Sequence, residues 1–73
     1  MNRDQHLKLA DQAVTRAEQL AGDAERYATS ADPNRYAQVG KYAEAGALWA
    51  DIARTHAAIA AAMTEAETEP AHA

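Results

Sequence analysis

A single apolar stripe with helical spacing runs along the second half of this 73-residue chain. It has a bulky edge and a small edge, each repeating every seven residues, and two isoleucines widen it. The bulky edge is Tyr42, Trp49, His56 and Met63, the small edge is Val39, Gly46, Ala53 and Ala60, and the isoleucines are Ile52 and Ile59. Such a repeat keeps side chains on one face of an α-helix. Because small side chains let helix axes approach to about 8 Å, the stripe predicts a helix with a close neighbour.

The first half predicts a second amphipathic helix, over residues 3–30. Leu7 and Val14 begin one seven-residue repeat, and Ala10 begins another beside it. Asn2 and Gln5 have the spacing of a capping box, which marks a helix start. Alanine fills 21 of the 73 positions and no strand pattern is present, so the sequence predicts an all-α fold.

The segment around Asp32 and Pro33 breaks the helical pattern. Asp32 is a good N-cap and proline is tolerated at the first position of a helix, so a second helix is expected to start there or soon after. Two versions of the second helix remain open. It either runs unbroken from Pro33 to about Glu67, or begins at Lys41 after a short helical turn within 33–40 that ends at Gly40. We favour the second version: a single domain of residues 1–66, with a linker at 31–40 and a helix at 41–66, forming an antiparallel hairpin. Residues 67–73 are expected to be a disordered tail, because their carboxylates oppose the helix dipole.

A 73-residue chain without cysteine buries only a marginal core, so we expect it to self-associate. Two hairpins would pack as a four-helix bundle dimer. The residues expected to form the association surface are Tyr42, Trp49, Ile52, His56, Ile59 and Met63, with Val39, Gly46, Ala53 and Ala60 in close helix contact. In the alternative, the protein is a monomer in which the first helix alone covers the stripe. Trp49 and the isoleucines would then remain partly exposed to solvent.

The function predicted from these features is a non-catalytic protein-interaction or oligomerisation module with an accessory or regulatory role. A rival prediction is a partner-folded regulator, similar in kind to an antitoxin or anti-factor, whose second helix docks into another protein through Trp49, Ile52 and Ile59. A stable symmetric oligomer would favour the first, and a monomer with exposed Trp49 the second.

Other function classes find little support in the sequence. Two alanine-rich helices rarely build a catalytic pocket, and no phosphate-binding loop or nucleophile motif is present, so we expect no enzyme and no cofactor. His56 has no acidic partner one turn away and reads as a packing residue, so no metal is expected. The net charge of −4 and the scattered cations argue against nucleic acid. The longest uncharged apolar run, residues 57–63, is too short to span a membrane, and no secretory signal is evident, which predicts a cytoplasmic protein.

Two resemblances accompany this interpretation. Gly40, Tyr42 and Ala45, followed by Trp49, resemble the turn and second helix of a tetratricopeptide repeat, whereas Asp32 and Pro33 depart from its first helix and no second copy follows. The stretch from Tyr42 to Ala60, together with the alanine- and glutamate-rich first helix, is similar to small alanine-rich helical proteins of actinobacteria and their phages. That resemblance implies a small helical cytosolic protein and transfers no activity.

Overall fold

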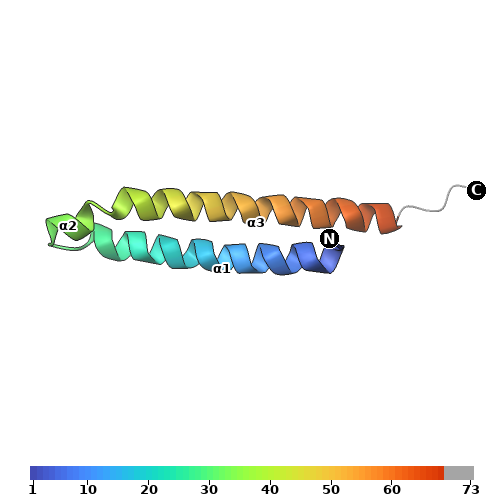
Figure 1. Cartoon of the computed structure of the whole chain (residues 1–73), viewed down its shortest axis with the longest axis horizontal. Coiled ribbons are helices and arrows are strands. Elements are labelled where there is room, and N and C mark those ends of the chain that lie inside the picture. The colour runs from blue at the N-terminus through green and yellow to red at the C-terminus, as the bar shows by residue number, and fades with distance from the viewer. Residues whose placement is uncertain (69–73) are drawn as a thin grey trace, which may run out of the picture.

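The computed structural model describes the backbone of residues 1–68 and the side chains of residues 1–66. It contains α1 (Arg3–Ala28), α2 (Pro33–Tyr36) and α3 (Val39–Thr68), and no strand within these residues. The long helices α1 and α3 lie side by side and antiparallel, with α2 at the connection (Figure 1). The molecule is 16 and 14 Å across its two shorter axes, which accommodates two helices and no third layer. The predicted all-α helical hairpin is confirmed.

A capping box begins α1, as the spacing of Asn2 and Gln5 predicts. The Asn2 side chain accepts a hydrogen bond from the Gln5 backbone N–H, and the Gln5 side chain accepts one from the Asn2 N–H, each at 2.8 Å. These bonds satisfy two of the backbone donors that a helix start leaves unpaired. The helix ends at Ala28, two residues before the expected boundary, and its C-cap Thr29 donates a side-chain hydrogen bond to the Arg26 carbonyl at 3.0 Å.

The connection differs from the favoured version, in which the second long helix begins at Lys41. A short helix does form, since Asp32 caps the N–H of Asn34 at 2.9 Å and Pro33 occupies its first turn. It stops earlier than expected, with a bond from the Gln38 N–H to the Arg35 carbonyl at 2.9 Å that spans only three residues. No glycine in the chain adopts a positive φ, so Gly40 terminates nothing and lies in the first turn of α3.

The far end of α3 also extends slightly past the expected boundary at residue 66, because its backbone remains helical to Thr68. The expected disorder of the tail therefore does not begin at residue 67. For residues 69–73, which lie outside the described part of the chain, it stays a prediction.

The core is a thin seam between α1 and α3. Its buried apolar residues are Ala10, Ala13, Leu20, Ala53 and Ala60. Gly46 is buried in the same seam, and a Cβ atom placed on it would lie 3.6 Å from both the Ala17 carbonyl oxygen and the Leu20 Cβ. Small side chains thus face each other across the hairpin, and Leu20 is the only large one in this core.

Candidate functional site

One side of α3 carries a patch of large apolar side chains that α1 leaves uncovered. Leu48 is 65% exposed, Trp49 38%, Ile52 41% and Ile59 38%. At 100° per residue, Leu48, Ile52 and Ile59 point within about 40° of one another, and Trp49 lies on their α1 side. We call these four residues the exposed face. Contiguous apolar surface of this kind marks interaction sites in soluble proteins.

The structure divides the residues expected at the association surface into two groups. Trp49, Ile52 and Ile59 belong to the exposed face. Tyr42, His56 and Met63 are half-buried instead, and the first two contact rings on α1. Leu48 was missed, although its spacing of four to Ile52 and eleven to Ile59 places it on their side of the helix.

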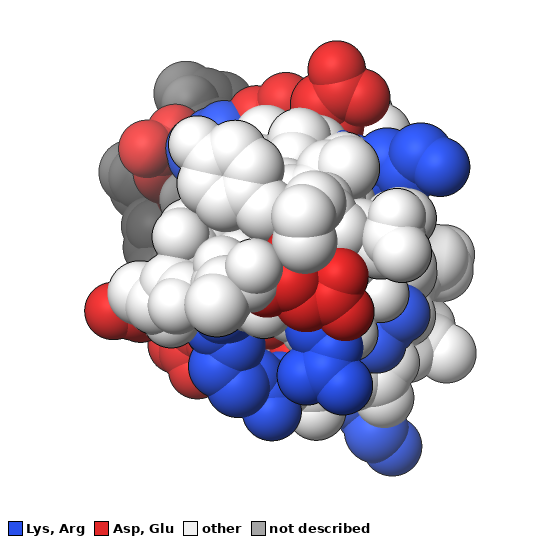
Figure 2. All heavy atoms as spheres, turned by 90° about the vertical axis from the view of Figure 1, so that its left-hand side faces the viewer, with Lys and Arg blue, Asp and Glu red and all other residues white. Residues whose placement is uncertain are grey.

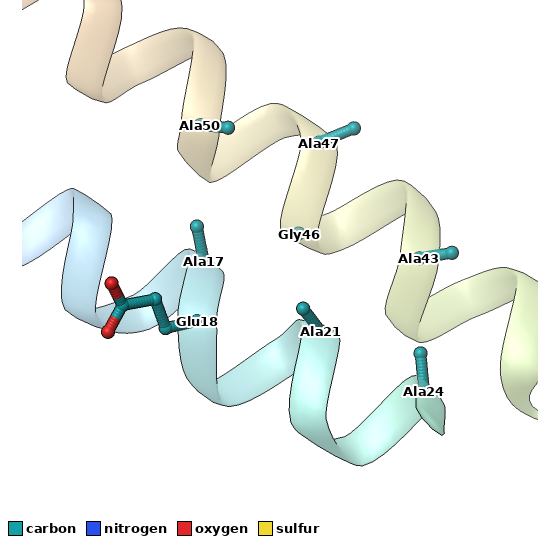
Figure 3. Close-up of a pocket in the computed structure, with 8 residues that line it drawn as sticks. All are labelled: Ala17, Glu18, Ala21, Ala24, Ala43, Gly46, Ala47 and Ala50. Carbon is teal, nitrogen blue, oxygen red and sulfur yellow. The ribbon is translucent and has the colours of Figure 1, made fainter. Parts of the chain in front are cut away.

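The residues expected in close helix contact all lie toward the seam. Gly46, Ala53 and Ala60 are buried, and Val39 is half-buried near the connection. Beside them runs a shallow groove lined mainly by alanines of both helices, with Gly46 opposite Ala17 and Ala21 (Figure 3). The groove offers a ligand no polar group except Glu18 at its rim. It follows from close packing of small residues and has no chemistry of its own.

Two aromatic contacts join α1 and α3, one near the connection and one towards the N-terminus of α1. Nearer the connection, the Tyr27 and Tyr42 rings meet edge to face, with centroids 5.0 Å apart and planes at 72°. Such a pair contributes about 0.5–1.5 kcal/mol beyond area burial. Hydrogen bonding to Tyr27 raises the pKa of Tyr42, with smaller contributions from the Tyr27 charge, burial and Asp23.

Towards the N-terminus of α1, the helices are joined by a pair of histidines. The Nδ1 atoms of His6 and His56 lie 2.9 Å apart, in a half-buried position. The ring centroids are 5.1 Å apart and the planes are tilted by 35°. Burial lowers the pKa of His6 from 6.5, and the charges of His56 and of the terminal ammonium lower it further. At least one ring is therefore neutral at pH 7, which lets one N–H donate to the other nitrogen.

Charged side chains flank the exposed face on α3, where Asp51 points about 60° and Glu44 about 40° from Leu48 around the helix. Four of the five acidic residues of α1 repeat every seven positions on its exposed side, as Asp4, Asp11, Glu18 and Glu25. Asp51 and Arg54 form an exposed ion pair on α3, of the kind that contributes under about 1 kcal/mol. At the connection end, uncharged side chains face the viewer and several Lys and Arg side chains gather along the lower edge (Figure 2).

Within residues 1–68, no helix contains an apolar stretch long enough to span a bilayer. In the same part of the chain, no three side chains of the His, Cys, Asp or Glu type gather where they could hold a metal ion. Comparison of the sequence with models of known families and with curated proteins, and of the fold with solved structures, gave no match.

Proposed function

We propose that this protein is a self-association module, in which two copies of the hairpin pack through the exposed face to form a four-helix bundle. The observation that carries this proposal is the exposure of Leu48, Trp49, Ile52 and Ile59 beside a core made almost entirely of alanine. Burying one such side chain fully is worth about 1.5–3 kcal/mol. A second hairpin could bury only the part of each side chain that α1 leaves exposed, between 38% and 65%, and would therefore contribute a corresponding fraction of this free energy.

The pattern along α3 favours a second copy as the partner. Its outward stripe reads Ala45, Leu48, Ile52, Thr55, Ile59 and Ala62. A two-fold axis between Ile52 and Thr55 would pair these two positions across the interface, Leu48 with Ile59, and Ala45 with Ala62. Ile52 would meet Thr55 on each side of the axis, Leu48 would meet Ile59 beyond them, and alanines would meet at both ends. Self-complementarity of this kind is what a two-fold interface requires.

The charge distribution is compatible with this pairing. Two copies with a net charge of −4 each repel one another at long range. Between Ala45 and Ala62 the outward stripe itself contains no Asp, Glu, Lys or Arg, and Asp51, which flanks it, is paired with Arg54. The acidic row of α1 would remain in solvent.

Ile52→Asp tests the proposal, with Ala58→Asp as its matched control. Both changes place the same carboxylate on an exposed position of α3, but Ala58 lies outside the outward stripe. Sedimentation and Trp49 fluorescence should show a dimer for the wild type and Ala58→Asp, and a monomer for Ile52→Asp. If the wild type is a monomer at tens of micromolar, the proposal is wrong, and the exposed face is then available to a different protein.

A cysteine scan tests the two-fold axis separately. The chain has no cysteine, so a single Thr55→Cys change gives one thiol close to the proposed axis. Under mild oxidation Thr55→Cys should form a covalent dimer much faster than Ala58→Cys. Equal rates would contradict pairing through this stripe.

A further inference from the structure

From the geometry of the histidine pair, we infer that His6 and His56 form a two-histidine site for a divalent transition-metal ion such as Ni²⁺ or Cu²⁺. The pair lies on the seam between α1 and α3 and is separate from the exposed face. The inference therefore does not rest on self-association, and each can fail without the other.

The separation of the two nitrogens fits one edge of a coordination sphere. Imidazole nitrogens bind such ions at about 2.0–2.1 Å. Two of them on one ion therefore lie about 2.9 Å apart at a right angle and about 3.4 Å apart at the tetrahedral angle. The observed Nδ1–Nδ1 distance of 2.9 Å matches the right-angled edge. Right-angled arrangements of nitrogen ligands are typical of Ni²⁺ and Cu²⁺, which also exceed most divalent ions in affinity for imidazole.

The metal would take the place of the proton between the rings, and the ring that donated it would carry its proton on Nε2 instead. With centroids 5.1 Å apart, the rings point nearly head to head, as an N–H···N hydrogen bond requires. Binding one ion at the right-angled edge requires each ring to turn by about 45°, so that both lone pairs converge beside the N···N line. Both side chains are half-buried, so each keeps part of its surface in contact with solvent.

Neutral imidazole is the metal-binding form, and burial, with the charges of His56 and the terminal ammonium, lowers the pKa of His6. Because a ligating imidazole must be unprotonated, acid should expel the ion. Because positions 6 and 56 come together only in the folded hairpin, the ion should bind the folded state and stabilise it.

The direct test is an NMR titration of the wild-type protein with Cu²⁺ at pH 7.5. Substoichiometric Cu²⁺ should broaden the ring signals of His6 and His56 before those of His72, and Mg²⁺ should leave all three unchanged. Preferential broadening of His72, or equal broadening of the three, would overturn the inference. This measurement needs no variant and therefore does not depend on whether a substitution folds.

Thermal denaturation with Ni²⁺ supplies the second test. The melting temperature of the wild type and of His72→Gln should rise with Ni²⁺ concentration, and this rise should be lost in both His6→Gln and His56→Gln. Circular dichroism would first establish that each variant is helical without metal. If either single variant keeps the full rise, or if the wild type shows none, the two histidines make only a hydrogen bond and the inference is wrong.

Discussion

Gly46 offers the sharpest test of how closely α1 and α3 pack. A Cβ at this position would lie 3.6 Å from the Ala17 carbonyl oxygen and from the Leu20 Cβ, and 3.8 Å from the Ala21 nitrogen. These are ordinary van der Waals distances, so Gly46→Ala should fit without displacing either helix. Alanine favours a helix interior over glycine by about 0.8–1 kcal/mol. Gly46→Ala should therefore stabilise the hairpin, raising its melting temperature by about 4–8 °C.

A larger side chain at the same position should reverse this gain. Two of the three neighbours are backbone atoms of α1, which cannot move aside as the end of a flexible side chain can. The atoms of leucine beyond Cβ would have to push the helices apart, and overpacking of this kind costs about 1–3 kcal/mol. Gly46→Leu should thus be less stable than Gly46→Ala by about 1–3 kcal/mol.

Gly22 provides the matched control, because nothing lies within 4 Å of a Cβ placed there. Alanine and leucine have similar helix propensities, so Gly22→Ala and Gly22→Leu should both stabilise and differ by only a few tenths of a kcal/mol. Urea denaturation of the four variants isolates the packing contribution as the difference between the two leucine-minus-alanine values. A difference near zero would mean that the helices do not approach closely at Gly46.

Three further predictions follow from the ends of the hairpin. Asn2→Ala removes the side-chain half of the capping box and should cost about 1 kcal/mol in urea denaturation, whereas Asn34→Ala, outside the long helices, should cost less. The pKa of His6 is lowered in the folded state, so the unfolded chain takes up a proton first as pH falls below 6.5. The free energy of unfolding should therefore decrease through that range, and the decrease should be smaller in His6→Gln. The pKa of Tyr42 is raised from 10 in the folded state, so the unfolded chain loses this proton first as pH rises. The free energy of unfolding should therefore decrease above about pH 10, and Tyr42→Phe should make that decrease smaller.

The hairpin itself could be predicted from periodicity, because each long helix has one apolar face and a single break separates them. The boundaries at the connection could not. Gly40 resembles a helix terminator, but glycine ends a helix chiefly by adopting a positive φ, which Gly40 does not. The break depends instead on local bonds at Ala37 and Gln38 that span three or four residues, and no residue type there signals them.

The histidine pair was beyond prediction for a different reason. His6 and His56 are 50 residues apart, and which side chains meet across two antiparallel helices depends on their register. That register depends on the length and shape of the connection. If α3 shifted by one helical turn relative to α1, His56 would move about 5 Å along α1. An error of two residues at the start of α3 is enough to leave the pairing undetermined.

The close seam and the exposed face have a common cause in the order of side chains along α3. Glycine and alanine at positions 46, 53 and 60 face α1 and draw the two helix axes together. Ile52 and Ile59 directly precede two of these small residues and so lie about 100° from them around the helix, at the border of the seam, where they are 41% and 38% exposed. Larger residues in the small row would widen the seam but lose the close contact of the backbones. Close pairing of the two helices within one hairpin therefore goes together with three large aliphatic side chains, Leu48, Ile52 and Ile59, that α1 covers only in part.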